Sequence, residues 1–292
     1  MILVPAFAAL VALANPQGPD SLLITSAQLA AQVGRPGLVL FHVGPRPDYD
    51  SAHIPGAQFL PVQDLNPVNG ALSLELPTPE RMDSILESRG ISDQSRIVLY
   101  WSSEWMSPTT RALLSLHWFG LGDRVAILQG GLPAWRAEGR PVTRDVPTPV
   151  AATGRLTPRP RQDVVVRADF VQSHLPPARG VAIVDARDTV FYLGRLPGSM
   201  PRAGRIPGAV SFPFSTVADS SGRFLAPTVL RARFAALGVQ PGDTVVTYCH
   251  IGQQATAVWL AARLAGYEAR MYDGSFQEWS RGPYPTVTSA RN

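Results

Sequence analysis

The sequence predicts an α/β protein made of two similar domains, each a mainly parallel sheet flanked by helices. Short apolar runs rich in Val and Ile alternate with helical runs along the chain, which is typical of parallel sheets covered on both faces. The same series of motifs also occurs twice, once in each half of the 292 residues. A chain of this length favours two domains over one. We therefore expect a duplicated α/β unit.

The motifs follow the same order in both halves. The first half contains a strand-like run at 37–44, Tyr49, an Ile-Pro-Gly-Ala tract at 54–57, a strand at 96–101, a helix at 108–119, a strand at 125–128 and a glycine-led turn at 130–135. The second half contains a strand at 180–187, Tyr192, an Ile-Pro-Gly-Ala tract at 206–209, a strand at 244–249, a helix at 254–265, a strand at 269–272 and a turn at 273–279.

A linker is predicted between the two halves. Residues 140–162 are rich in Pro, Thr and Arg and have no apolar period, which is typical of a segment that runs over the surface. We predict one domain over 21–145, a linker over 146–162 and a second domain over 163–292.

The N-terminus has the composition of an export signal. Residues 2–14 are nearly all apolar, end in Ala-Leu-Ala and precede a polar run. This segment is too short to span a bilayer but suits the core of a signal peptide. We predict a signal peptide and N-terminal tail over 1–20 and a periplasmic or secreted protein, without a membrane span. Because no basic residue precedes the apolar run, a cytoplasmic protein is the alternative.

The charged residues exclude several classes of function. The net charge is +4, and all 26 basic residues are Arg. Without Lys, neither Schiff-base chemistry nor a P-loop is available. The Arg residues are scattered, so we expect no nucleic-acid partner, although a mild positive field would attract small anions. One Cys and five dispersed His indicate no metal site, and no cofactor is indicated.

The best candidate for a nucleophile is Cys249, the only cysteine of the chain. It ends the predicted strand 244–249, just before a turn that contains Gly252 and the helix 254–265. Loop N–H groups and the positive end of that helix both favour a thiolate. The alternative is an inert cysteine in the hydrophobic core.

The first half lacks these groups. It has Trp101 where the second half has Cys249, and it has His42 and Gly44 where the second half has an acidic and a basic residue. The segment after Trp101 is also about four residues longer. An indole cannot replace a thiolate, so we predict a non-catalytic first domain that forms one wall of a cleft.

Two serines follow Trp101 and are alternative nucleophiles. However, no His or Asp pairs with Ser102 or Ser103 in the sequence, and a serine nucleophile needs a base. We therefore do not expect a serine-based site.

Taken together, these motifs resemble those of tandem-domain rhodanese-type sulfurtransferases, in which the N-terminal domain is inactive and the C-terminal domain is active. The resemblance extends from about residue 22 to 288. It rests on five features: Cys-x-x-Gly at a strand-to-helix turn, Asp185-Ala186-Arg187, the two Ile-Pro-Gly-Ala tracts, Asp273-Gly274-Ser275, and Trp279.

The resemblance implies a thiosulfate sulfurtransferase. A Cys249 thiolate would take the outer sulfur of a small anionic donor, typically thiosulfate, and pass it from a persulfide to cyanide or a thiol. Backbone N–H groups of the loop would bind the donor, and no cofactor is needed. These groups belong to His250, Ile251, Gly252, Gln253 and Gln254.

Arg187 is the predicted cationic contact of the donor, because its planar fork can pair with two oxygens. The alternative is a structural salt bridge with Asp185 or a neighbouring residue. We expect Asp185 and Asp273 to support the site rather than to contact the donor.

The residues next to the cysteine depart from both branches of the family. Thiosulfate users commonly carry a basic pair after the Cys, and mercaptopyruvate users carry small residues there, whereas this chain has His250 and Ile251. Mercaptopyruvate users also place a second Arg shortly after the first, where this chain has residues 192–194, Tyr-Leu-Gly. We therefore favour thiosulfate, with 3-mercaptopyruvate as the alternative donor.

The side chain of His250 has two interpretations. It can hydrogen-bond or protonate a leaving group, since a histidine changes charge near neutral pH. The preferred interpretation is a loop residue that contributes only its N–H.

The sequence also bears on two other functions. Phosphatases of related fold have an Arg six residues after the Cys, but this chain has Ala255 there, which argues against phosphate chemistry. A non-catalytic sulfur carrier or interaction module stays open as an alternative. Because a duplicated domain already has an internal partner, we expect a monomer.

Overall fold

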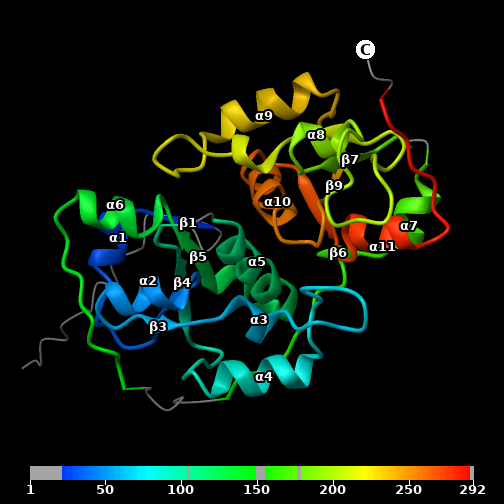
Figure 1. Cartoon of the computed structure of the whole chain (residues 1–292). Coiled ribbons are helices and arrows are strands. Elements are labelled where there is room, and N and C mark those ends of the chain that lie inside the picture. The colour runs from blue at the N-terminus through cyan, green and yellow to red at the C-terminus, as the bar shows by residue number, and fades with distance from the viewer. Residues whose placement is uncertain (1–21, 104–105, 149–154, 176–178, 290–292) are drawn as a thin grey trace, which may run out of the picture.

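The two predicted α/β units are both present in the computed structural model (Figure 1). The structure describes residues 22–103, 106–148, 155–175 and 179–289. The predicted signal peptide at 1–20 lies outside these residues, as does part of the predicted linker. Each half forms a five-stranded sheet in which all neighbouring strands are parallel, as the sequence predicted.

The first sheet has the strand order β1-β5-β4-β2-β3. Its strands are β1 (Leu23–Ile24), β2 (Leu38–His42), β3 (Gln58–Phe59), β4 (Arg96–Tyr100) and β5 (Val125–Leu128). The helices of this half are α1 (Ser26–Ala30), α2 (Arg46–Ser51), α3 (Val62–Leu65), α4 (Pro79–Glu87), α5 (Ser107–Leu116) and α6 (Gly131–Ala137).

The second sheet has the corresponding order β6-β10-β9-β7-β8. Its strands are β6 (Val165–Val166), β7 (Val181–Asp185), β8 (Val210–Ser211), β9 (Thr244–Tyr248) and β10 (Glu268–Tyr272). The helices of this half are α7 (Ala168–Ser173), α8 (Thr189–Tyr192), α9 (Pro227–Ala236), α10 (Ala255–Leu264) and α11 (Ser275–Arg281).

The predicted helix 108–119 differs from the observed one at its end. Helix α5 ends at Leu116 and continues as a π-helical turn, His117–Leu121, in which Gly120 has φ of 102°. A Cβ on Gly120 would lie 2.5 Å from the carbonyl oxygen of Arg159, so only glycine fits there. The short strands β1 and β6 and the helices α4 and α9 were not predicted from the sequence.

The repeated sequence motifs make the same hydrogen bonds in both halves. The hydroxyl of Tyr49 donates to the Ala57 carbonyl, and that of Tyr192 donates to the Ala209 carbonyl, each at 2.9 Å. Each tyrosine thereby closes the turn that its Ile-Pro-Gly-Ala tract forms. These tracts therefore recur because they build the frame.

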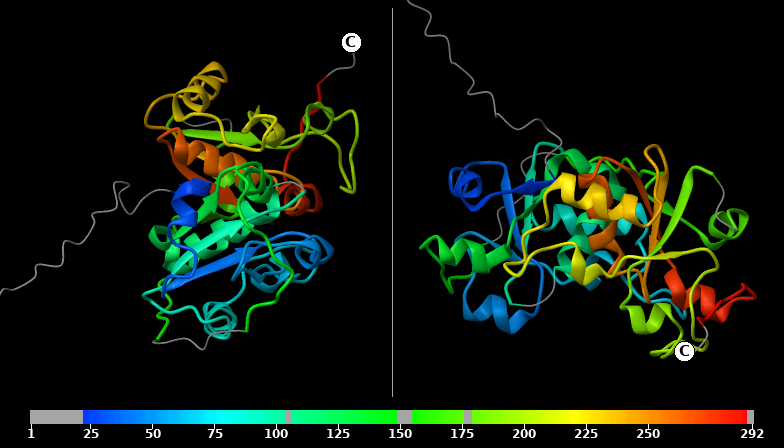
Figure 2. Two further views of the ribbon diagram at one scale, coloured as in Figure 1. Left: turned by 90° about the vertical axis from the view of Figure 1, so that its left-hand side faces the viewer. Right: turned by 90° about the horizontal axis from the view of Figure 1, so that it is seen from above.

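The two sheets share one hydrophobic core through helices α5 and α10, which lie side by side in the middle of the molecule (Figures 1 and 2). At their contact the buried hydroxyls of Thr110 and Thr256 are 2.7 Å apart. These residues occupy corresponding places in the two repeats, so the halves pack around an approximate twofold axis.

None of the helices in the described part of the chain is long and apolar enough to cross a membrane.

Candidate active site

The candidate site lies on the loop 249–254, between strand β9 and helix α10. Strand β9 is buried and is the central strand of its sheet, between β7 and β10. Its carboxyl end therefore lies at the middle of the edge that the strand ends form. Ligands of open parallel sheets bind at this edge. Gly252 has φ of +78°, and a Cβ there would lie 2.8 Å from the Asp273 carbonyl oxygen. The sharp turn after Cys249 therefore requires glycine.

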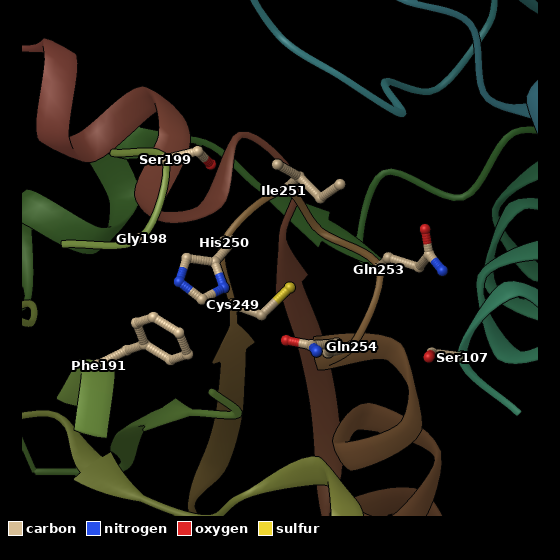
Figure 3. Close-up of a pocket in the computed structure, with 9 residues that line it drawn as sticks. All are labelled: Ser107, Phe191, Gly198, Ser199, Cys249, His250, Ile251, Gln253 and Gln254. Atoms are coloured by element: carbon tan, nitrogen blue, oxygen red, sulfur yellow. The ribbon is translucent and has the colours of Figure 1, made fainter. Parts of the chain in front are cut away.

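A pocket of about 450 Å³ opens above this loop (Figure 3). The sulfur of Cys249 points into it, although the whole residue is only 1% exposed. Ser107, the first residue of helix α5 in the first repeat, also lines it, so both repeats contribute to the pocket. The lining residues are Ser107, Phe191, Gly198, Ser199, Cys249, His250, Ile251, Gln253 and Gln254.

The loop around the sulfur carries unpaired hydrogen-bond donors. Among the described residues, no acceptor is recorded for the backbone N–H groups of 250–254, while the N–H of Cys249 donates to the Ser275 hydroxyl at 3.3 Å. Helix α10 also has no side-chain cap at Gln254. Free N–H groups and the positive helix end together form a site for an anion.

Arg187 is not among the residues that line the pocket. Its guanidinium donates to both carboxylate oxygens of Asp185, at 2.9 and 2.6 Å, and to the Gly204 carbonyl at 2.8 Å. It also lies 4.1 Å from the centre of the Phe276 ring and is 1% exposed. The buried ion pair with Asp185 has the geometry of the alternative, a structural salt bridge, and the direct contact of Arg187 with the donor stays a prediction.

Asp185, predicted to support the site, lies in a buried hydrogen-bond network that reaches the residue before Cys249. Besides Arg187, it accepts a hydrogen bond from the hydroxyl of Tyr248 at 2.7 Å. Tyr248 ends strand β9 directly before the cysteine, and its oxygen accepts the Ile206 N–H at 3.2 Å. Burial raises the pKa of Tyr248, so the hydroxyl stays protonated. This network fixes the start of the loop.

His250 lines the pocket as a neutral ring. Its imidazole lies edge-on to Phe191, with 4.6 Å between ring centroids, and its buried Nε2 has no partner among the described residues. Burial, with the Arg187 charge as a second cause, lowers the pKa of His250 to about 4. The imidazole is therefore uncharged at neutral pH and offers a hydrogen bond rather than a charge.

Sequence reasoning missed Arg111 of helix α5. The residue is fully buried, and its Nη1 donates to the Gly252 carbonyl at 3.1 Å and to the Asp273 carboxylate at 2.6 Å. Asp273, expected as a supporting residue, therefore acts by holding Arg111. The sequence did contain a signal for this role. Arg111 is a charged residue within the mainly apolar run 108–119, and a buried charge needs a partner.

The pocket residues Ser107, Phe191, Gly198 and Ser199 were also missed. They come from α5, α8 and the loop after α8 and are brought together only by the packing of the two repeats.

The first repeat holds a polar cluster that the sequence did not predict. The Ser102 hydroxyl donates to the Asp48 carboxylate at 2.7 Å and lies 3.0 Å from Nε2 of His42. The sequence shows no such pairing because His42 and Asp48 lie 60 and 54 residues before Ser102. In a hydrolase triad the histidine lies between the serine and the acid, whereas here the serine lies between the other two. The cluster lacks the order of a catalytic relay, and Trp101 fills the place of the cysteine.

No group of three or more His, Cys, Asp or Glu side chains within the described ranges is placed to hold a metal ion.

Comparison with known proteins gives a consistent result. The rhodanese-like domain family matches residues 25–138 and 168–281. The chain is 34% identical over 282 residues to the "Probable 3-mercaptopyruvate sulfurtransferase" of Pseudomonas aeruginosa, covering 91% of this chain and 98% of that protein. It is 31% identical over 264 residues to the "Thiosulfate sulfurtransferase" of Azotobacter vinelandii, covering 90% and 95%.

A sulfur carrier and a solved structure are also similar. The "Sulfur carrier protein TtuD" of Thermus thermophilus is 33% identical over 249 residues, covering 79% of this chain and 83% of that protein. Wild-type EanB has the same fold, with a TM-score of 0.82 at 22% identity, covering 92% of this chain and 70% of that one.

Proposed function

Since the chain belongs to the rhodanese family of sulfurtransferases, with two such domains in tandem, we propose that it moves the outer sulfur of thiosulfate to a thiol or cyanide through a persulfide on Cys249. The observation that carries this proposal is the sulfur of Cys249 in a pocket edged by unpaired N–H groups. Such a site suits both a reactive thiolate and an anionic donor.

The reaction has two displacement steps. The Cys249 thiolate attacks the outer sulfur of thiosulfate, the sulfur–sulfur bond of the donor breaks, and sulfite leaves with the electron pair. The acceptor then attacks the outer sulfur of the persulfide, and the Cys249 thiolate is regenerated. The loop N–H groups stabilise negative charge on the sulfite and on the persulfide in turn.

The lining of the pocket favours thiosulfate over 3-mercaptopyruvate. Carboxylate substrates are commonly held by a bidentate arginine, but none of the nine lining residues is cationic and Arg187 is committed to Asp185. A compact oxyanion needs only the N–H groups and the helix end. Because the Pseudomonas aeruginosa relative carries the name of a mercaptopyruvate enzyme, this donor is the alternative to test.

A carrier function is the second candidate, favoured by the similarity to the Thermus thermophilus sulfur carrier. A carrier would accept sulfur on Cys249 but would turn over slowly with small acceptors.

Intact-mass analysis after incubation with thiosulfate tests the proposal. We expect wild-type protein to gain one sulfur atom and the Cys249→Ser variant to gain none. With cyanide as acceptor, thiocyanate production separates an enzyme from a carrier. Failure of wild-type protein to gain sulfur would contradict the proposal. Faster turnover with 3-mercaptopyruvate than with thiosulfate would identify 3-mercaptopyruvate as the donor.

A further inference from the structure

Arg111 belongs to the non-catalytic repeat, yet its guanidinium reaches the catalytic loop. Its Nε donates to the Asn66 side-chain oxygen at 2.6 Å, and its Nη2 donates to the Leu74 carbonyl. Its Nη1 donates to the Gly252 carbonyl at 3.1 Å and to Asp273 at 2.6 Å. The first two contacts anchor the guanidinium within its own repeat, so it meets the loop as a fixed group.

The bond to the Gly252 carbonyl determines how one peptide unit of the loop is turned. A trans peptide is planar, so the N–H of Gln253 points away from the Gly252 carbonyl. That carbonyl faces Arg111, and Gln253 lines the pocket whereas Gly252 does not. With its carbonyl held by Arg111, the peptide directs the N–H of Gln253 toward the pocket side.

The same peptide has little else to hold it. Gly252 has no side chain and a positive φ, a conformation from which glycine turns at low cost. Without a donor at its oxygen, the peptide is free to turn its carbonyl toward the pocket. A carbonyl dipole in that position would repel an anion, and the Gln253 N–H would be lost to the site.

We propose that Arg111 is a positioning residue that holds the Gly252–Gln253 peptide with its N–H directed at the sulfur pocket. The non-catalytic repeat thereby completes the anion site of the catalytic one. The consequence for turnover rests on the proposed function, whereas the effect on the loop does not.

Alkylation of Cys249 tests the proposal without any sulfur donor. Iodoacetate is an anion and iodoacetamide is neutral, so the ratio of their rates measures how well the loop accepts negative charge beside the sulfur. We expect Arg111→Met to lower this ratio about tenfold, since oriented donors contribute at least that much to oxyanion stabilisation. Thiosulfate turnover should fall at least as far, mainly in kcat.

Three further variants make the result specific. Arg111→Met/Asp273→Asn removes the unpaired carboxylate and should keep the lowered ratio, because the hydrogen bond to Gly252 is still missing. Arg111→Lys should lower the ratio less, about threefold, since one ammonium cannot serve all four acceptors. Gln277→Ala removes the interdomain bond to the Ser73 N–H (2.8 Å) without touching Gly252 and should leave the ratio unchanged.

The unfolding midpoint of each variant is measured alongside, and Arg111→Lys serves as the main variant if Arg111→Met does not fold. An unchanged ratio in the folded Arg111 variants would overturn the proposal. So would an equal loss in Gln277→Ala, or recovery of the ratio in the double variant. If wild-type protein fails to load sulfur from thiosulfate, the proposed function falls while the alkylation ratio still decides the role of Arg111.

Discussion

The two repeats share one frame and differ in the residue that ends the central strand. In the first repeat the Leu132 N–H donates to the carbonyl of Trp101 at 2.8 Å, and in the second the Phe276 N–H donates to the carbonyl of Cys249 at 3.0 Å. The backbone therefore holds both positions in the same way. Trp101 is 5% exposed, and its indole fills the space at the end of the strand. The smaller side chain of Cys249 leaves room for a pocket. Side chains, rather than the fold, distinguish the repeat with the thiol from the repeat with the indole.

The floors of the two sites differ in charge. Asp185 and Arg187 form a buried ion pair in the second repeat. In the first repeat the neutral ring of His42 takes this place, and a Cβ on Gly44 would lie only 3.2 Å from its Cε1. Burial lowers the pKa of His42 to about 4. A neutral ring and a small residue thus replace two opposite charges.

The repeats also exchange contacts unequally. The Leu76 N–H donates to Asp273 at 3.3 Å, and the Phe224 N–H donates to the side chain of Gln129 at 3.0 Å, so each repeat receives a loop from the other. The first repeat places the guanidinium of Arg111 on the loop 249–254, where the second repeat has Ala257 as its counterpart, and Arg281 of the second repeat donates instead to the Ala71 carbonyl at 3.1 Å. Arg111 of the first repeat therefore contacts the loop 249–254 of the second, whereas Ala257 carries no group that could make the corresponding contact.

The strongest test of this comparison moves the cysteine. A Trp101→Cys/Cys249→Ser protein should remain at least about a thousandfold below wild-type sulfur transfer. The reason is that the segment after position 101 is longer, and its Ser102 holds the Asp48 carboxylate of α2, which repels an anionic donor. Intact-mass analysis after thiosulfate treatment is the measurement, with wild-type protein as the positive control. Sulfur on position 101 would show that the thiol alone makes a site.

Breaking the buried ion pair should have the next largest effect. Arg187→Met leaves the Asp185 carboxylate buried without its partner and should lower the free energy of unfolding by about 3–5 kcal/mol. Adding Asp185→Asn should recover much of this loss, since no buried charge then remains. Urea unfolding of both variants measures the difference. Equal stability of the single and double variants would contradict the pairing.

Acid should weaken the first repeat through His42. Its pKa is near 4 when folded and 6.5 when unfolded, so only the unfolded chain takes up the proton as the pH falls through this window. The contribution of the neutral His42 ring to the free energy of unfolding is complete above about pH 6.5. At pH 5 this contribution should be smaller by about 2 kcal/mol. Unfolding of wild-type and His42→Gln proteins at pH 5 and pH 7 measures it. The variant should show a shallower pH dependence, and an identical slope would argue against a neutral buried ring.

The smallest effect is expected at Gln129. Gln129→Ala removes one hydrogen bond to the Phe224 N–H and should cost about 1 kcal/mol of stability. Sulfur transfer should not change, because this contact involves no residue of the loop 249–254. The matched variant Asp273→Asn should lower transfer, because Asp273 holds Arg111. Equal activity of the two variants would remove the asymmetry between the repeats.

Much of the frame was readable from the sequence. β-branched runs alternating with helical runs, duplicated with their Ile-Pro-Gly-Ala tracts, predicted two parallel sheets, and both sheets are present. The strands β1 and β6 were missed because two residues carry no period. Cys249 and Gly252 were identifiable because local backbone chemistry determines a strand-to-helix turn.

Tertiary packing decided the partners of the charged and polar groups. Arg187 is buried against Asp185, two residues before it, which is the geometry of a structural salt bridge, and its contact with the donor stays a prediction. The contact of Arg111 with Gly252 spans 141 residues, and that of Ser102 with Asp48 spans 54. The sequence by itself determined the periodicities, the duplicated turns and the single thiol. Which charge meets which partner depends on burial and distance, and those exist only once the two repeats have packed together.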